Sequence, residues 1–391
     1  MDTGLSKAKG KRGYQGCPPQ DGQIPNLSCK WRHVTFLSFS FIGCDEEIHS
    51  LLMNVHFAKG IVALTIVIAA TSATSSAQSV VEIRLGTIVP KASLWHETLQ
   101  YVRQEWRRIS NGVVQVKIYP GGVLGDEVEM VRKVRQGTIE AVGLSSVGLS
   151  RIDEGVSCLQ VPMMFRSYAE LDHVRERLAT KLEQRIEAKG FKVLNWADGG
   201  WIHTFTRTPA RTPEDVRKLK LFTTAGDPET ERLYKQFGFN VVPLSLTDMV
   251  TSLQTGMINA FSVVPLFAQL QESYKLAPNM IDILWMPLVG GTVISQRAWD
   301  KIPAVHRPAM REAAVSAGER LRGDIRAMGD AAVHAMEKQG LQVIRLDPAT
   351  RAAWQSAAEA SYPKLRGRYC PADLFDEVQN LRDAFRRSTR P

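Results

Sequence analysis

Two adjacent serines are the first residues whose type and setting could do chemistry. Ser145 and Ser146 lie in the segment GLSSVG, residues 143–148, which approaches the nucleophile elbow of hydrolases. That motif needs a glycine two residues before and two residues after the serine. Val147 comes two residues after Ser145, and Leu144 comes two residues before Ser146, so neither serine fits. The small residues instead predict a strand end that another group approaches closely.

The other polar residues give no support for phosphate, metal or acid–base sites. The glycine-rich stretch at 121–125 lacks the Lys-Ser or Lys-Thr ending of a P-loop, and we interpret it as a turn before a helix. His96-Glu97 has no second histidine four residues later, as a zinc-binding helix would. The acidic pair Asp153-Glu154 is interpreted as solvated surface. We therefore expect a protein that is not an enzyme and that needs no metal or cofactor.

Composition indicates a folded globular protein. The chain has 391 residues, 44% of them hydrophobic, which is enough apolar material for one large or two ordinary domains. Its formal charge is +9, but Lys and Arg are scattered among acidic residues and form no basic stripe interleaved with aromatic residues. These features exclude a mainly disordered chain and argue against a nucleic-acid partner.

The amino-terminal region predicts export. Residues 61–70, IVALTIVIAA, form an apolar run followed by small polar residues, which is the layout of a secretory signal peptide. The run is shorter than the roughly 20 apolar residues that a membrane-spanning helix needs. Met53 stands where such a peptide would begin, and Ala77 suits cleavage. We expect a signal peptide over 53–77, an artefactual upstream extension over 1–52 and a periplasmic location; the alternative is a cytoplasmic extension on a signal anchor.

Two cysteines remain in the predicted mature chain, Cys158 and Cys370. Exported proteins fold in an oxidising compartment, where such a pair could form a disulfide. Two separate buried thiols fit the sequence equally well.

Apolar periodicity and turn residues predict alternating strands and helices. Strands are expected at 81–89, 113–119 and 139–144, with a helix opened by Ser93 between the first two and a helix from Asp126 to Gln136 between the last two. This order is typical of a parallel sheet with crossover helices. The alternation continues with helices at 168–189, 228–237 and 247–254, strands at 191–197, 218–223, 258–264 and 341–346, and a long helix between Pro303 and Gly340.

Five short motifs follow one another in the mature chain. They are IYPGGVLG at 118–125, VRQGT at 134–138, VPMMFR at 161–166, TPED at 212–215, and LQTG at 253–256 followed by Ala260. Together they resemble the solute-binding protein of a tripartite ATP-independent periplasmic (TRAP) transporter, the DctP-like family. The similarity runs from about Val81 past Trp299.

The resemblance implies a fold and partners. We expect an α/β chain with the two-lobed periplasmic binding protein fold, type II-like, with crossing hinge strands and a long bracing helix. Lobe I would hold residues 78–202 and 288–329, and lobe II residues 203–287 and 330–391. A monomer would close on a small-molecule solute and deliver it to the membrane subunits of a TRAP transporter.

This chain differs from the family that it resembles at the residues expected to bind the ligand. The usual ligand is an organic acid, held by an Arg whose planar fork pairs with the carboxylate. That Arg should follow Lys220-Leu221, where Phe222 stands. The position of the family's second Arg aligns with Ile202, and that of its polar Asn aligns near Val263. A buried carboxylate without a partner costs several kcal/mol, so we expect a solute with a larger apolar or aromatic part.

The expected ligand contacts combine aromatic and polar side chains. The aromatic contacts are Trp201, Phe222 and Phe261, and the polar contacts are Ser145, Ser146, Thr223, Thr224, Asp227 and Asn259. The rings could instead belong to the core, and Asp227 could either bind an amine or cap the following helix. Two other functions stay open: an extracytoplasmic sensor without a transport partner, and an exported hydrolase that uses Ser145.

Overall fold

The computed structural model describes residues 79–389 of the chain. The signal peptide predicted over 53–77 and the upstream extension predicted over 1–52 lie outside these residues. No helix within 79–389 has both the length and the apolar character needed to cross a bilayer.

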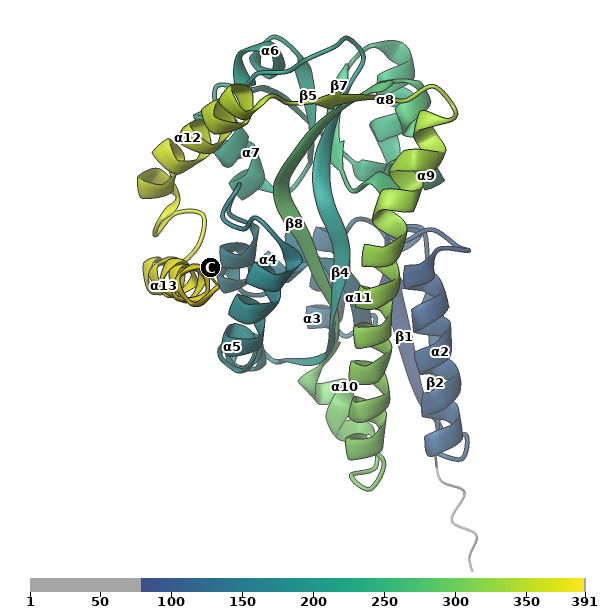
Figure 1. Ribbon diagram of the computed structural model, residues 1–391. Coiled ribbons are helices and arrows are strands. Elements are labelled where there is room, and N and C mark those ends of the chain that lie inside the picture. Colours follow the sequence, from purple (N-terminus) through teal and green to yellow (C-terminus); the bar gives the residue numbers. More distant parts are fainter. Residues whose placement is uncertain (1–78, 390–391) are drawn as a thin grey trace, which may run out of the picture. The chain divides into compact units, whose positions relative to one another are not determined.

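The described residues form one mixed sheet with helices packed around it. Its centre is the antiparallel pair β4 (Phe191–Thr206) and β8 (Asn279–Ser295), which run the length of the fold between its two lobes (Figure 1). On one side follow β3 (Ala141–Ser145), β1 (Val81–Thr87) and β2 (Val114–Tyr119); on the other follow β7 (Ala260–Val263), β5 (Lys220–Thr224) and β6 (Asn240–Leu244), while β9 (Gln342–Arg345) pairs with β8. The expected two-lobed α/β fold is confirmed.

The direction of the strands matches the sequence prediction on the flanks and differs at the centre. β1 pairs parallel with both β2 and β3, and β5 pairs parallel with both β6 and β7. The parallel units with crossover helices are therefore confirmed. The pairs β3–β8, β4–β8 and β4–β7 are antiparallel, because β4 and β8 cross from one lobe to the other in opposite directions.

The two long strands β4 and β8 differ most from the sequence prediction. The sequence predicts that β4 ends at Ala197, but the strand continues to Thr206 and has 16 residues in all. Its register shifts between Asp198 and Gly200 and at two other places. Gly200 has φ +98°, so it provides the left-handed backbone of a bulge inside the strand. β8, with 17 residues, was not recognised as a strand; its continuous apolar run lacks the alternation of a half-buried strand.

The helices that the sequence predicts are present with bounds within a few residues of the expected ones, and further helices accompany them. The bounds are α2 (Leu94–Ile109), α3 (Glu127–Gln136), α4 (Ser146–Ser150), α5 (Tyr168–Glu187), α6 (Pro213–Arg217), α7 (Pro228–Gln236), α8 (Met249–Thr255), α9 (Pro265–Leu270), α10 (Gln296–Lys301), α11 (Arg307–Glu337), α12 (Pro348–Leu365) and α13 (Ala372–Ser388), with short 3-10 turns η1 (Glu154–Gln160), η2 (Leu246–Asp248) and η3 (Ser273–Lys275). The Ser93 and Asp126 side chains cap α2 and α3, and Gly137, at φ 77°, ends α3.

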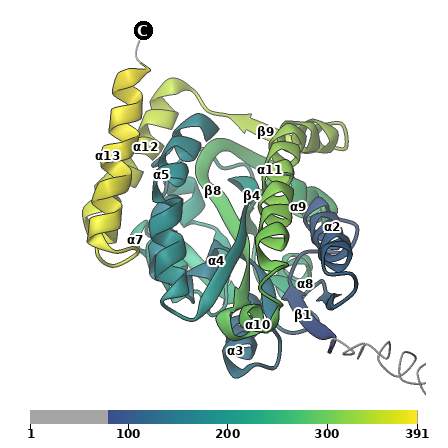
Figure 2. The same cartoon turned by 90° about the horizontal axis from the view of Figure 1, so that it is seen from below.

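The long helix α11 braces the central strands. It has 31 residues and buries one face that includes Met310, Ala314 and Leu321. Figure 2 shows α11 against the β4–β8 pair with α2 beside it, while α5, α12 and α13 gather on the opposite side. At Gly318 a Cβ atom would lie 2.5 Å from the backbone oxygen of Trp196, so glycine lets helix and strand approach closely. The expected bracing helix is confirmed.

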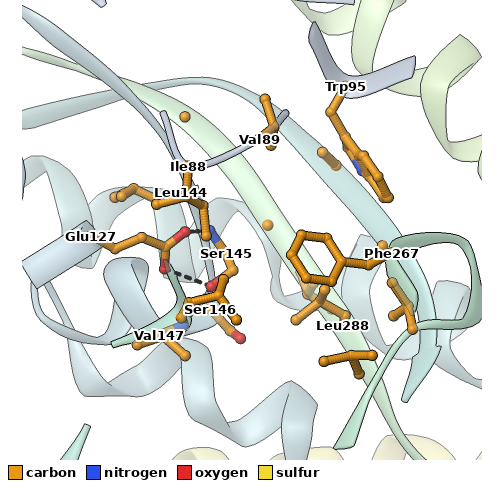
Figure 3. Close-up of a pocket in the computed structure, with 18 of the residues that line it drawn as sticks. Ile88, Val89, Trp95, Glu127, Leu144, Ser145, Ser146, Val147, Phe267 and Leu288 are labelled. Atoms are coloured by element: carbon orange, nitrogen blue, oxygen red, sulfur yellow. Dashed lines mark hydrogen bonds between the residues drawn. The ribbon is translucent and has the colours of Figure 1, made fainter. Parts of the chain in front are cut away.

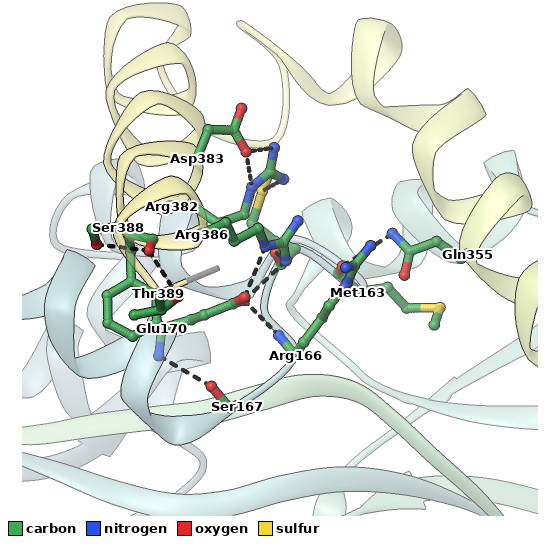
Figure 4. A network of polar contacts seen from close by, with 12 residues as sticks. Met163, Arg166, Ser167, Glu170, Gln355, Arg382, Asp383, Arg386, Ser388 and Thr389 are labelled. Atoms are coloured by element: carbon green, nitrogen blue, oxygen red, sulfur yellow. Dashed lines mark hydrogen bonds and ion pairs between the residues drawn. The ribbon is translucent and has the colours of Figure 1, made fainter. Parts of the chain in front are cut away.

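The lobe boundaries stay a prediction, and one contact crosses them. The predicted boundaries at 202 and 288 fall inside β4 and β8, at positions that nearly face each other in the register. However, α13, assigned to lobe II, packs on α5, assigned to lobe I. Arg386 of α13 donates to both carboxylate oxygens of Glu170 on α5, with Nε to Oε1 at 2.7 Å and Nη2 to Oε2 at 2.9 Å (Figure 4).

The two cysteines of the described residues are free and buried. Cys158 and Cys370 both lie in the largest apolar core, which also contains Trp285, Trp354 and Phe375. Burial raises the pKa of the Cys158 thiol well above its usual value and that of Cys370 to about 12. Of the two alternatives left open by the sequence, the structure has the separate thiols.

Candidate functional site

A cavity of about 230 Å³ lies between the two lobes. The carboxyl ends of several strands converge on it: Ile88 and Val89 follow β1, Ser145 ends β3, and Thr223 and Thr224 end β5. The central strands β4 and β8 pass beneath it with Ile202 and Leu288. Ligands of open α/β sheets bind at carboxyl ends of strands, so the cavity has the expected place for a solute site.

One wall of the cavity is apolar. Trp95 and Phe267 contribute rings, and Phe222, Ile202, Val263 and Leu288 contribute further apolar surface. Figure 3 shows Trp95, Phe267 and Leu288 across the cavity from Glu127 and the two serines. The family resemblance places two Arg and one Asn at three positions that all line this cavity. In this chain the three positions hold Phe222, Ile202 and Val263. Within the described part of the chain, no Arg, Lys or His lines it.

Glu127 is a buried carboxylate in the opposite wall. Its oxygens accept hydrogen bonds from the backbone N–H and hydroxyl of Ser145, both at 2.6 Å, and from the N–H of Gly148 at 2.9 Å (Figure 3). Burial raises the pKa of Glu127, although these three hydrogen bonds favour the ionised form. Glu127 therefore fixes the end of β3 and the start of α4.

Asp198 reaches the cavity from the bulge in β4. It is 2% exposed, and its Oδ1 pairs with Arg175 of α5. Its Oδ2 lies 3.0 Å from Nε of Arg326 on α11. The indole N–H of Trp95 donates to the backbone oxygen of Asp198 at 3.2 Å. Two guanidinium groups thus neutralise this carboxylate from outside the cavity.

Asp227 lies at the start of α7. Its Oδ1 accepts from the N–H of Thr230 at 3.2 Å and lies 3.7 Å from Nη2 of Arg151. The helix-capping role that the sequence allowed is therefore present. The carboxylate is also paired with a cation, which argues against the amine-binding role.

The expected ligand contacts divide into two groups. Ser145, Ser146, Phe222, Thr223, Thr224 and Asp227 line the cavity. Trp201, Phe261 and Asn259 are not among the lining residues. Trp201 packs on Tyr168 with ring centroids 5.5 Å apart, and Phe261 stacks on Phe205 at 5.1 Å. The Asn259 side chain accepts from the N–H of Lys220 at 2.6 Å.

Side-chain alternation along the strands explains these differences. Neighbouring residues of a strand point to opposite faces, so Ile202 faces the cavity while Trp201 enters the core. Sequence reasoning missed Trp95, Phe267, Glu127 and Asp198 as lining residues. Trp95 and Glu127 looked like ordinary first-turn residues of helices, and Asp198 followed the predicted end of its strand, so no local signal marked them.

Comparison with known proteins agrees with this architecture. Residues 85–367 match the family model described as bacterial extracellular solute-binding protein, family 7. The 2,3-diketo-L-gulonate-binding periplasmic protein of Escherichia coli is 27% identical over 243 residues, covering 60% of this chain and 72% of that protein.

Two crystal structures of TRAP periplasmic solute-binding proteins show the same fold. The Ralstonia eutropha protein with bound (S)-2-acetolactate has a TM-score of 0.73 at 21% identity, and the Haemophilus influenzae protein with bound L-gulonate has 0.72 at 22%. Both comparisons cover 78% of this chain and 99% of the other. With its two lobes, crossing strands and interlobe cavity, this chain belongs to the bacterial extracellular solute-binding proteins of family 7, the DctP family of TRAP transporters.

Proposed function

We propose that this protein captures a small organic solute with a substantial apolar or aromatic part and delivers it unchanged to the membrane subunits of a TRAP transporter. Membership of the family supports solute binding and a periplasmic location, with export through the signal peptide predicted at 53–77. The similar proteins bind acids: those from Ralstonia and Haemophilus hold acetolactate and gulonate.

One observation carries the choice of solute. Phe222, where the family resemblance places the carboxylate-binding Arg, lines the cavity and is 4% exposed. Ile202 and Val263 occupy the other two anchor positions. An acid bound here would lose its hydration without gaining a guanidinium partner. An apolar body gains free energy from burial against these side chains instead.

We propose a set of ligand contacts on this basis. Phe222 and Thr223 remain from the sequence prediction, together with Ser146. Trp95 and Phe267 replace Trp201 and Phe261 as the aromatic contacts of the solute. Ser145 acts on the site through Glu127, because its hydroxyl donates a hydrogen bond to that carboxylate.

A solute screen of the exported protein tests this function. Thermal shift and intrinsic tryptophan fluorescence would be followed with organic acids, alcohols and aromatic compounds. Removing the ring with Phe222→Ala should weaken the best ligand by about 1–3 kcal/mol, whereas Phe222→Leu, which keeps most apolar contact, should weaken it less. Tight binding of succinate or gulonate, without binding of aromatic or branched compounds, would contradict the proposal.

Transport is tested separately. Cells that carry this protein with TRAP membrane subunits should take up the identified solute only when both are present. A solute that the protein binds but that cells with both components do not take up would favour the sensor alternative.

A further inference from the structure

Two buried hydroxyl groups of the cavity have no hydrogen-bond partner within the described chain. They are Oγ of Ser146 and Oγ1 of Thr223. Ser146 is 2% exposed and Thr223 is 3% exposed, and both line the cavity. An unpartnered buried hydroxyl costs free energy, so a ligand that bonds to either of these groups would stabilise it.

The two hydroxyls come from opposite lobes. Ser146 begins α4 directly after β3, and Thr223 lies in β5. In the sheet, β3 and β5 stand on opposite sides of the central β8–β4 pair. A ligand group that bonds to both hydroxyls would therefore hold the two lobes together.

The charged groups around the cavity are already paired. The Glu127 oxygens accept three hydrogen bonds from Ser145 and Gly148. The Asp198 carboxylate pairs with Arg175 and Arg326. Because Glu127 accepts from three donors and Asp198 pairs with two guanidinium groups, neither carboxylate is free to bind a ligand.

The third carboxylate, Asp227, caps α7 and faces Arg151. Because no Arg, Lys or His of the described residues lines the cavity, an anionic ligand would find no counter-charge. A cationic ligand would have to compete for a paired carboxylate. A charge of either sign that is buried without a partner carries a large desolvation cost.

We propose that the solute is uncharged, and that one hydroxyl group on its apolar body is held between Ser146 Oγ and Thr223 Oγ1. A hydroxyl group can donate to one of these oxygens and accept from the other. The apolar body lies against Phe222, Trp95 and Phe267. This inference rests on the proposed solute-binding function and narrows it from an organic solute to an alcohol or phenol.

Four compounds with one ring and different head groups test the inference: benzyl alcohol, benzoate, benzylamine and toluene. Binding to the exported protein would be measured at pH 7 by calorimetry and by intrinsic tryptophan fluorescence. Benzyl alcohol should bind at least about 10-fold more tightly than benzoate or benzylamine, and severalfold more tightly than toluene.

Hydroxyl deletions identify the contacts. Ser146→Ala and Thr223→Val should each weaken benzyl alcohol about 3- to 10-fold and leave toluene unchanged. Ser150→Ala is the matched control, because its hydroxyl donates to Val147 O at 2.8 Å within the same short helix and lies outside the cavity lining. Thermal unfolding of each variant checks that it is folded.

The outcomes distinguish a failure of this inference from a failure of the proposed function. The inference is wrong if benzoate or benzylamine binds most tightly, if the hydroxyl deletions leave benzyl alcohol unaffected, or if benzyl alcohol does not bind. Benzoate binding that Phe222→Ala weakens would leave the proposed function standing. No saturable binding by these four compounds or by any solute of the wider screen would defeat the proposed function itself.

Discussion

Arg326 on the long helix α11 holds Asp198 in the wall of the cavity, with Nε 3.0 Å from Oδ2. The same guanidinium group donates to Asp172 of α5 at 2.6 and 2.8 Å. It also lies over the ring of Tyr168, 4.2 Å from the centroid. One cation therefore joins the bracing helix, the bulge of β4 and the start of α5.

Removing this cation should destabilise the protein. Arg326→Ala leaves Asp198, 2% exposed, with one of its two cations, and breaking such a buried pair costs about 3 kcal/mol. Arg322→Ala is the control, because Arg322 lies 3.9 Å from Asp172 in a more exposed position and should cost less than about 1 kcal/mol. Urea unfolding measures both; equal losses would contradict the assigned role of Arg326.

Two glycines of α11 should respond in opposite ways to alanine. A Cβ at Gly318 would lie 2.5 Å from Trp196 O, so Gly318→Ala should push helix and strand apart and cost about 1–3 kcal/mol. Apart from the adjacent helix backbone, nothing lies within 4 Å of a Cβ at Gly323, so Gly323→Ala should stabilise the helix by up to about 1 kcal/mol. Thermal unfolding distinguishes them, and a stabilising Gly318→Ala would show that α11 does not pack closely on β4.

Restoring a guanidinium group should change the ligand class. Phe222→Arg would place a cation in the cavity wall and should improve benzoate binding about 10- to 150-fold, the range of hydrogen bonds to charged groups. Phe222→Leu is the control, since it changes the packing without adding charge. Calorimetry at low and high salt measures the effect, and an unchanged benzoate affinity in a folded Phe222→Arg variant would show that position 222 does not meet the ligand.

The α13 contact should make stability depend on acid pH. Burial alone would raise the pKa of Glu170, but hydrogen bonds from Arg386 and from the N–H of Arg166 outweigh it, and the pKa is lowered. The contribution of this ion pair to stability is therefore complete above the pKa of about 4.3 that a Glu has in the unfolded chain. It is lost as the pH falls through the lower pKa of Glu170 in the folded protein.

Arg386→Ala tests this dependence. The variant should be less stable at pH 7 by about 1–3 kcal/mol and should lose less stability than the original protein between pH 5 and 3. The exposed neighbour Arg387 supplies the control Arg387→Ala. Parallel pH profiles of Arg386→Ala and the unchanged protein would rule out this contribution of the ion pair.

The buried cysteines should resist thiol reagents. Because burial raises the pKa of Cys158 and Cys370, little thiolate forms at pH 8. A colorimetric disulfide reagent should react slowly with the folded exported protein and rapidly in urea. Fast reaction in the folded state would show that this core opens readily.

Much of the architecture could be predicted from local sequence. The caps Ser93 and Asp126, the terminator Gly137 and the long helix α11 were predicted because helix ends and helical periodicity depend on residues a few positions apart. The replacement at Phe222 was also visible in the sequence, since the preceding Lys220-Leu221 fixes its alignment with the family.

Only the tertiary structure decided which side chains meet in the cavity. The Gly200 bulge changes the register of β4, and pairing with the unrecognised strand β8 determines the face on which Ile202 and Trp201 lie. The charges of Asp198 and Asp227 are paired by Arg175, Arg326 and Arg151, which come from other elements. Such contacts join residues far apart in the chain, so local periodicity carries no information about them, and only folding pairs these two carboxylates with cations.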